Sequence, residues 1–216
     1  MNIIKYIIIA IISYLLGNIS SGVLIARAFG IKDIRKEGSG NAGTTNVPRT
    51  IGWLPSVLTL AGDCLKGMIA CLIGKYVSGD VGMLLAGLCV TLGHDFPVFL
   101  GFKGGKGIAT SLGMILVISP ALALSLLAVE LVIIAVTRYV SLASLSVTVA
   151  YPLLNIIIFR DNAHYGWYVF FAVVCGLLSL YCHRGNLMRL IRHEENRLDF
   201  KKISKLTSKL KAGKKN

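Results

Sequence analysis

The sequence GSGNAGTTNVPR at residues 38–49 lies between two apolar runs that are each long enough to cross a lipid bilayer. Two further polar segments interrupt the apolar sequence in the same way: GFKGGKG at residues 101–107, and HRGN at residues 183–186, which continues to Arg189. We call these the first, second and third polar segments. Residues of these types are costly beside lipid and common where a protein binds phosphate. The pattern predicts a membrane protein with a site built from its loops.

The composition supports the membrane prediction. Hydrophobic residues make up 55% of the 216 residues, the mean hydropathy is +0.71, and only 15% of the residues are charged. The apolar runs are too continuous to form the one-sided stripes of a soluble core. The five cysteines lie in or beside apolar runs without a Cys-x-x-Cys pair, which indicates buried thiols rather than disulfides or a zinc site.

Seven apolar runs are expected to be transmembrane helices, so the predicted fold is an all-α polytopic membrane protein. The first run lacks a basic start and a cleavage site, and it is therefore retained as a helix. Asp63 and Lys66 allow an interruption or a later start of the second helix, and Ser119-Pro120 separates the fourth from the fifth. The predicted helices lie near residues 3–28, 54–76, 81–100, 107–119, 121–137, 140–159 and 164–182.

The distribution of Lys and Arg predicts the orientation in the membrane. Nineteen of these residues fall on the side that carries all three polar segments, and three, namely Lys5, Lys75 and Arg160, fall on the other. By the positive-inside rule, the polar segments and the C-terminus are cytoplasmic and the N-terminus is outside.

We expect one transmembrane catalytic domain, residues 1–195, followed by a basic cytoplasmic tail, residues 196–216. Apolar residues of the tail recur at helical spacing among many lysines. This pattern is typical of a basic helix on an anionic leaflet, and a disordered charged tail is the alternative. The spaced apolar residues are Phe200, Ile203, Leu206 and Leu210.

The first polar segment has the residues of an anion-binding loop. Its glycines allow backbone N–H groups to turn inward, and its short side chains add hydrogen-bonding groups. Arg49 can donate two hydrogen bonds to one phosphate. The match to Gly-x-Gly-x-x-Gly is rejected as a dinucleotide fingerprint because no buried strand precedes it. The short polar side chains are those of Ser39, Asn41, Thr44, Thr45 and Asn46.

The second polar segment predicts a further phosphate contact. Gly104 and Gly105 let the backbone approach an oxyanion, and Lys106 supplies a positive charge. A helix that starts at Ile108 would place its N-terminus at the same spot. The segment is not a Walker A motif because Gly107 follows Lys106, and we expect His94 before it to belong to a structural turn.

The third polar segment places His183 and Asn186 on one helical face. Glu195 lies half a turn away from that face on a continuous helix, so it either follows a break or pairs with Arg189 or Arg192. The pair Asp63 and Lys66 is self-neutralising, and both a packing role and a substrate-facing role remain open for it.

Several kinds of chemistry are absent from the sequence. No His has Asp five positions later, as the acid–base dyad of many acyl-CoA-dependent acyltransferases requires. No acidic cluster suits Mg²⁺, and no His, Cys or carboxylate spacing suits zinc. We therefore expect neither a cofactor nor a metal, and no nucleic-acid partner.

Residues 38–49, 93–110 and 183–195 together resemble the three motifs of the bacterial acyl-phosphate-dependent glycerol-3-phosphate acyltransferase family, and the resemblance extends along essentially the whole chain. It implies a seven-helix enzyme of the bacterial inner (plasma) membrane that transfers a fatty acyl group from acyl phosphate to the primary hydroxyl of glycerol 3-phosphate. The products are lysophosphatidic acid and phosphate, in the first acylation of phospholipid synthesis. The sequence departs from the motifs at Ala42, where Pro is frequent, and at His193, where Gly is usual.

The resemblance and the residue chemistry together assign expected roles. Ser39, Lys106, His183 and Asn186 are the expected catalytic residues. The general base is either His183 or an oxygen of the donor phosphate. The expected substrate-binding residues are Asn41, Thr45, Asn46, Arg49, Gly104, Gly105 and Glu195.

Two other functions fit parts of the sequence. A transporter of an organic or inorganic phosphate anion would use the intramembrane Asp63 and Lys66, although the polar segments gather at one surface rather than at the midplane. A scaffold would recruit a soluble lipid-synthesis enzyme through the basic tail.

Overall fold

The computed structural model describes residues 3–213, with side chains as far as Ser208, and the described residues contain helices but no strand. The side chains of Leu210 and of the lysines beyond Ser208, which the tail prediction included, lie outside this range. The elements are α1 (Ile3–Gly17), α2 (Ser21–Ala28), η1 (Ile34–Lys36), α3 (Val47–Thr50), α4 (Trp53–Asp95), η2 (Val98–Leu100), α5 (Ile108–Ile118), α6 (Pro120–Thr137), α7 (Val140–Ile158), α8 (Tyr165–Ile191) and α9 (Phe200–Gly213).

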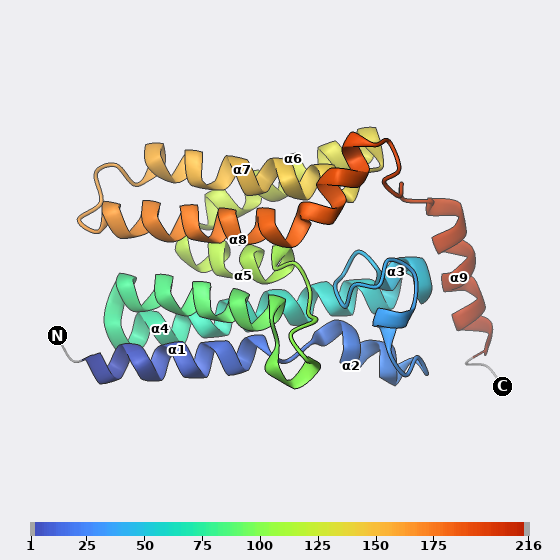
Figure 1. Ribbon diagram of the computed structural model, residues 1–216, viewed down its shortest axis with the longest axis horizontal. Coiled ribbons are helices and arrows are strands. Elements are labelled where there is room, and N and C mark those ends of the chain that lie inside the picture. Colours follow the sequence, from blue (N-terminus) through green and yellow to red (C-terminus); the bar gives the residue numbers. More distant parts are fainter. Residues whose placement is uncertain (1–2, 214–216) are drawn as a thin grey trace.

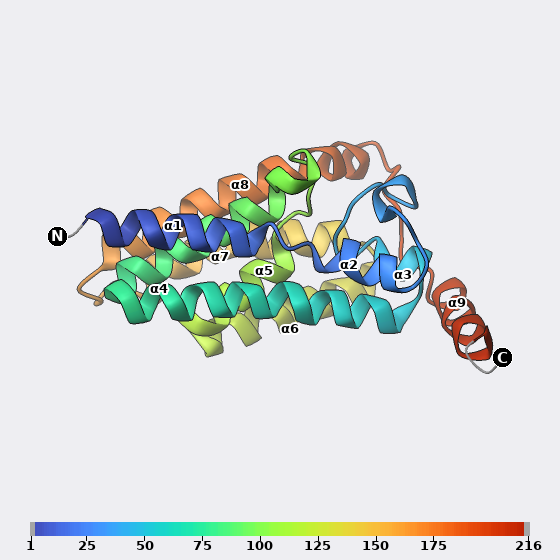
Figure 2. The ribbon, with the colours of Figure 1, turned by 90° about the horizontal axis from the view of Figure 1, so that it is seen from below.

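The long helices lie along the axis of an elongated bundle, as Figures 1 and 2 show. The start of α1 is at one end of the bundle, and α9 is at the other (Figure 1). Large apolar side chains face outward, such as Ile7, Val132 and Leu177, which are 52%, 61% and 62% exposed. Such surfaces suit lipid rather than water. Five helical segments are long and apolar enough to cross a membrane: Ile3–Ala28, Trp53–Leu100, Pro120–Thr137, Val140–Ile158 and Tyr165–Ile191.

The α4 segment is a helical hairpin. It contains the predicted helix 54–76 and most of the predicted helix 81–100, which ends at Asp95. The two are joined where Ser78 and Gly79 leave helical geometry, with Gly79 at a φ of +62°. A Cβ atom on Gly74 would lie 2.3 Å from the carbonyl oxygen of Gly82, so the two arms pack backbone against backbone. The 48 residues of Trp53–Leu100 therefore have the length of two crossings. The predicted interruption near Asp63 is wrong, because the first arm continues through that residue.

The prediction of one continuous helix over 3–28 is also wrong, because the chain breaks between α1 and α2. Backbone groups freed inside a bilayer need partners from the protein. Lys66 supplies them: its Nζ donates to the carbonyl oxygens of Gly17 and Ile19 at 3.1 and 2.7 Å. The same Nζ lies 2.9 Å from Asp63 Oδ1 and 2.8 Å from His94 Nδ1. Asp63 thus neutralises the buried charge of Lys66, while Lys66 supplies hydrogen bonds to the carbonyl oxygens freed at the break.

The helices that follow carry the third polar segment. The predicted helix 164–182 continues to Ile191, so His183 and Asn186 lie on α8 rather than after it. α5 and α6 meet at Ser119, whose hydroxyl accepts from the Leu122 N–H at 3.4 Å and caps α6.

Part of the tail forms a helix, which agrees with the first of the two predicted alternatives. Ile203 on α9 is 1% exposed, and the rings of Phe200 and Trp53 stack with centroids 6.0 Å apart. The backbone N–H of Trp53 donates to Thr207 Oγ1 at 3.0 Å. α9 is therefore held against the start of α4.

Candidate active site

A cavity of about 210 Å³ lies where the three polar segments meet the sides of α4, α6 and α7. Its walls bring together residues separated by as many as 156 positions, from Ser39 to Glu195. Three of the expected site residues, Asn46, Gly104 and Gly105, do not line it. The expected residues that do line it are Ser39, Asn41, Thr45, Arg49, Lys106, His183, Asn186 and Glu195.

Arg49 offers unused hydrogen-bonding capacity to this cavity. It lies on α3, a short helix with Pro48 in its first turn. Its Nη2 donates to the carbonyl oxygen of Asn196 at 3.1 Å, whereas its Nε is buried without a hydrogen-bond partner among the described residues. Burial lowers the pKa of Arg49, but an arginine keeps its charge at neutral pH. A buried, charged donor without a partner suits an anionic ligand.

Lys106 adds a second cation. Gly107, with a φ of +75°, turns the chain into α5, so Lys106 stands at the N-terminus of this helix as predicted. Burial first, and then the positive charge of Arg189, lower the pKa of Lys106 to about 8, while Glu195 acts in the opposite direction. Lys106 Nζ donates to Asn186 Oδ1. A phosphate dianion bound between Lys106 and Arg49 would relieve the repulsion between these cations.

Glu195 supports the contact between the second and third polar segments, which Asn186 makes with Lys106. Its Oε1 accepts from Asn186 Nδ2 at 3.2 Å, and its Oε2 forms an ion pair with Arg189 Nε at 2.9 Å. Because Asn186 also accepts from Lys106, a continuous chain of side chains runs from Arg189 to Lys106. Of the two expected explanations for Glu195, both hold, since it follows a break and pairs with Arg189.

The break that returns Glu195 to the cavity occurs at His193. His193 has a φ of +58°, the left-handed conformation that favours glycine. The N–H of Glu194 donates to Arg189 O at 2.8 Å and that of His193 to Leu190 O at 3.1 Å, which closes the end of α8. These two bonds form the helix-ending motif whose left-handed position is usually Gly. His193 therefore occupies a glycine position and keeps the turn at some cost in strain.

His183 is oriented as a base. Its Nδ1 lies 2.9 Å from the carbonyl oxygen of Ser179 on the preceding turn of α8. A carbonyl oxygen only accepts, so Nδ1 carries the hydrogen and Nε2 is the basic nitrogen of the neutral ring. The ring is 3% exposed and lines the cavity.

Asn46 shapes the first polar segment and does not line the cavity. The side chain is fully buried, and its Oδ1 accepts from the Ser39 N–H at 2.7 Å. Its Nδ2 donates to the carbonyl oxygens of Ile34, Glu37 and Asn41 at 2.9–3.1 Å. The structure assigns the Asn46 amide to holding the loop, and the expected substrate contact stays a prediction.

Gly104 and Gly105 also differ from expectation. Their backbone N–H groups donate to the carbonyl oxygens of Asp95 and His94 at 3.2 and 3.0 Å, so they are not free to bind an oxyanion. A Cβ atom on Gly105 would lie 1.9 Å from His94 Nε2. The glycines let the loop before Lys106 pack directly on His94.

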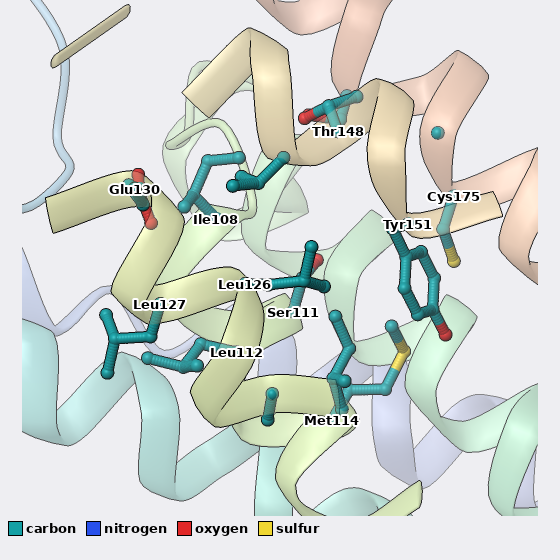
Figure 3. Close-up of a pocket in the computed structure, with 15 residues that line it drawn as sticks. Ile108, Ser111, Leu112, Met114, Leu126, Leu127, Glu130, Thr148, Tyr151 and Cys175 are labelled. Carbon is teal, nitrogen blue, oxygen red and sulfur yellow. The ribbon is translucent and has the colours of Figure 1, made fainter. Parts of the chain in front are cut away.

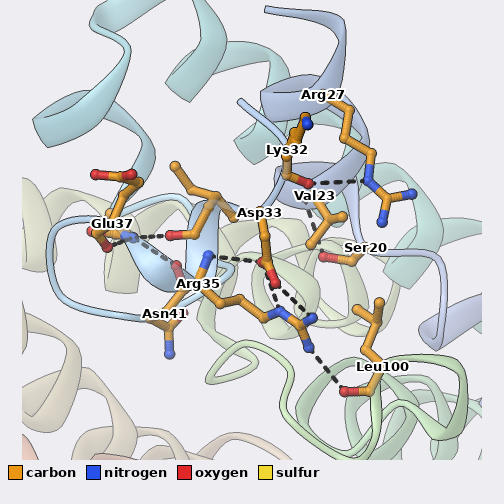
Figure 4. Close-up of polar contacts among 11 residues, drawn as sticks. Ser20, Val23, Arg27, Lys32, Asp33, Arg35, Glu37, Asn41 and Leu100 are labelled. Atoms are coloured by element: carbon orange, nitrogen blue, oxygen red, sulfur yellow. Dashed lines mark hydrogen bonds and ion pairs between the residues drawn. The ribbon is translucent and has the colours of Figure 1, made fainter. Parts of the chain in front are cut away.

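The loops that precede the first and second polar segments are joined by a contact that no sequence pattern indicates. Asp33 forms two hydrogen bonds with the guanidinium of Arg35, at 2.9 and 3.0 Å, and these lower the pKa of Asp33 to about 2. Figure 4 shows the same guanidinium reaching the carbonyl oxygen of Leu100, which accepts from Nη1 at 2.9 Å. The aligned Arg35 thus ties the loop before Ser39 to the loop before Lys106.

The buried network around Lys66 borders the cavity. Asp63 and His94 line the cavity, whereas Lys66 does not. Each of the two roles left open for this pair therefore falls to one residue. Lys66 has the packing role, since it donates to the carbonyl oxygens at the break between α1 and α2. Asp63, which pairs with Lys66, lies in the cavity wall.

A smaller, apolar cavity of about 50 Å³ continues from the polar one between α5, α6, α7 and α8. Figure 3 shows Leu112, Met114 and Tyr151 among its lining residues, with Glu130 on α6. Glu130 lines both cavities, and its Oε1 accepts from Ser144 Oγ at 3.0 Å. Glu130 is not among the expected site residues, although an acidic residue within an apolar helix is itself a signal for a functional site.

We predict that His193→Gly stabilises the protein by about 0.5–1 kcal/mol, because it removes the strain of a left-handed side chain at a glycine position. Thermal unfolding in detergent measures this. The control is His164→Gly at the start of α8, where φ is −106° and glycine brings no relief. A loss of stability in His193→Gly would show that the turn is not strained.

Comparison with known proteins identifies the family. The family model for glycerol-3-phosphate acyltransferase matches residues 7–193. The glycerol-3-phosphate acyltransferase of Thermoanaerobacter pseudethanolicus is 42% identical over 192 residues, which cover 89% of this chain and 95% of the relative. That of Clostridioides difficile is 43% identical over 208 residues, covering 94% of this chain and 100% of the relative.

Solved structures agree with this match. The crystal structure of PlsY (YgiH), an integral membrane glycerol 3-phosphate acyltransferase, superposes in its glycerol 3-phosphate form with a TM-score of 0.82 at 42% identity, covering 90% of this chain and 96% of that one. Its lysophosphatidic acid form gives a TM-score of 0.81 at 40% identity, covering 92% and 97%. Since the family model, the sequence identity and the fold agree, the chain belongs to the glycerol-3-phosphate acyltransferase family of integral membrane enzymes.

Proposed function

We propose that this acyltransferase moves a fatty acyl group from acyl phosphate to the primary hydroxyl of glycerol 3-phosphate and releases lysophosphatidic acid and phosphate. This is the first acylation of phospholipid synthesis. The observation that carries the proposal is a polar cavity with Arg49 and Lys106 that continues into an apolar one. The glycerol 3-phosphate and lysophosphatidic acid forms of PlsY support the acceptor and the product.

In this proposal the two cations bring two phosphorylated reactants together. Acyl phosphate is a mixed anhydride and needs no covalent activation by the enzyme. The phosphate oxygens are held by Arg49, Asn41 and Thr45. Ser39 adds a hydrogen bond to a phosphate oxygen or to the carbonyl oxygen of the donor. Lys106, positioned by Asn186, neutralises the phosphate as it leaves. Fixed charge and close approach of the reactants supply much of the rate acceleration.

The acyl transfer then runs in one displacement. The acceptor hydroxyl oxygen bonds to the carbonyl carbon of the donor, and the bond from that carbon to the phosphate oxygen breaks. His183 Nε2 takes the hydroxyl proton, since its Nδ1 hydrogen is committed to Ser179. Glu195 acts at a distance from the reacting atoms by holding Asn186 and Arg189.

The orientation proposed for the enzyme is seven crossings of the bacterial inner membrane, with the N-terminus outside and the active site and C-terminus cytoplasmic. The excess of Lys and Arg at one face supports it. In Figure 1, α3, the end of α8 and α9 gather at the end of the bundle opposite the start of α1. The hairpin turn of α4 provides the extra crossing, and α5 is the shortest one.

An assay of the purified protein with alternative acyl donors tests the proposed function. Acyl phosphate with glycerol 3-phosphate is expected to yield lysophosphatidic acid and phosphate in equal amounts, and acyl-CoA or acyl carrier protein is expected to yield neither. Arg49→Ala is the inactive control. Turnover with acyl-CoA instead, or uptake of phosphate into proteoliposomes without acyl transfer, would reject the proposal.

We predict that His183→Ala lowers kcat by about 10²–10⁴-fold with little change in KM, the effect of losing a general base. His164→Ala, a histidine outside the cavity, provides the matched control. Near-normal kcat in His183→Ala at saturating substrate would assign the proton to an oxygen of the donor phosphate.

The lowered pKa of Lys106 predicts a pH dependence. Lys106 is charged below its pKa of about 8 and neutral above it, so kcat/KM for glycerol 3-phosphate is expected to fall as the pH rises through about 8. Lys106→Arg keeps its charge and is expected to lose this alkaline limb, whatever its absolute rate. A wild-type profile that stays flat to pH 9, or the same limb in Lys106→Arg, would contradict this assignment.

A further inference from the structure

A third cavity adjoins the active site on the other side of Arg49. It measures about 320 Å³, and it shares two residues, Ser39 and Arg49, with the active-site cavity. The two cavities therefore meet at the arginine proposed to hold phosphate. This third cavity, which we call the vestibule, is lined by Gly38, Ser39, Arg49, Asn196, Arg197, Asp199, Lys202 and Ile203.

The vestibule wall comes largely from the C-terminal part of the chain. Asn196, Arg197 and the first turns of α9 supply it, and they follow residue 193, where the family match ends. This wall thus lies beyond the residues that the family model matches.

The wall is held firmly in place. Leu198 is 7% exposed, and its N–H donates to the carbonyl oxygen of Arg138 at 2.8 Å. α9 is fixed by buried Ile203 and by the stacking of Phe200 on Trp53. The carbonyl oxygen of Asn196 accepts from Arg49 Nη2. The C-terminal segment therefore makes a hydrogen bond to Arg49, the side chain proposed to hold phosphate.

The charges of the vestibule favour an anion. Arg197 and Lys202 are exposed. Together with Arg49 they give the vestibule lining three basic residues and one acidic residue, Asp199. Arg197 is further oriented by the ring of Tyr139, whose centroid lies 4.9 Å from its Cζ. Asp199 accepts the N–H of Lys202 at 3.0 Å and caps α9. Concave sites lined by one sign of charge concentrate ligands of the opposite sign.

We propose that the vestibule is the access route for the water-soluble phosphate ester, glycerol 3-phosphate, which passes from Arg197 and Lys202 to Arg49. This inference rests on the proposed function. The acyl donor, whose chain belongs in lipid, reaches the site through the apolar cavity between α5 and α8 instead. The C-terminal segment thus raises the local concentration of the acceptor alone.

The double variant Arg197→Gln, Lys202→Gln tests the vestibule in steady-state assays at low salt. KM for glycerol 3-phosphate is expected to rise about threefold or more, since steering by charge changes association rates by tenfold and above. The values of kcat and of KM for the donor stay unchanged. At an ionic strength of about 1 M, where the screening length is about 3 Å, the difference from the unmodified protein disappears.

Asp199→Asn tests the sign of the effect. Asparagine caps a helix as well as aspartate does, so α9 is retained while the negative charge is removed. KM for glycerol 3-phosphate is expected to fall. A rise in KM, with unfolding temperatures matched to the unmodified protein, would contradict the steering role.

The matched control is Lys5→Gln, Lys75→Gln, which removes the same charge from exposed positions near the start of α1 and the turn of α4. Its KM is expected to stay within about twofold, because these charges lie at the end of the bundle opposite α9 (Figure 1). An equal rise in KM for both double variants, or no rise in the vestibule variant, would overturn the inference. Absence of turnover by the unmodified protein would refute the proposed function itself.

Discussion

The site depends on a chain of polar contacts that runs from Arg189 through Glu195 and Asn186 to Lys106. Glu195 is 8% exposed and is held between an arginine and an amide, so the end of α8 and the start of α5 cannot shift independently. Removal of one partner from such a buried network leaves the others uncompensated, which is costly. The network therefore fixes the position of Lys106, the cation proposed to neutralise the leaving phosphate.

A second layer of contacts supports the loops from the bilayer side. Lys66 satisfies the carbonyl oxygens at the break between α1 and α2 and neutralises Asp63, beside His94. His94 in turn packs against Gly105, the residue before Lys106. Irregular backbone is tolerated at membrane depth only where the protein supplies such partners. The same residues that make the breaks possible also position the active-site loops.

Much of the fold was predictable because membrane-length apolar runs are a strong signal. The all-helical membrane fold follows from composition and spacing, whereas the sequence left the α9 helix open beside a disordered tail. The continuity of α8 to Ile191 and the break after Gly17 were not predictable, because partners distant in sequence contact both: Lys106 bonds to Asn186, and Lys66 bonds to the carbonyl oxygen of Gly17.

The same distinction holds within the site. Arg49, Lys106 and His183 reach one cavity as expected, because each stands in a polar segment with no other evident use. Asn46 and the backbone of Gly105 carry the same chemical groups as a binding residue, yet these groups are consumed by Ser39 and His94. Only the three-dimensional partners distinguish the two cases.

The central claim is that Arg49 and Lys106, from segments far apart in the chain, act on one bound reactant. The equilibrium Kd of glycerol 3-phosphate for the unmodified protein, Arg49→Gln, Lys106→Gln and the double variant tests it most directly. The account predicts a coupling of at least about 1 kcal/mol, because residues that share a ligand are not additive. Strictly additive losses, or unchanged Kd in either single variant, would contradict it.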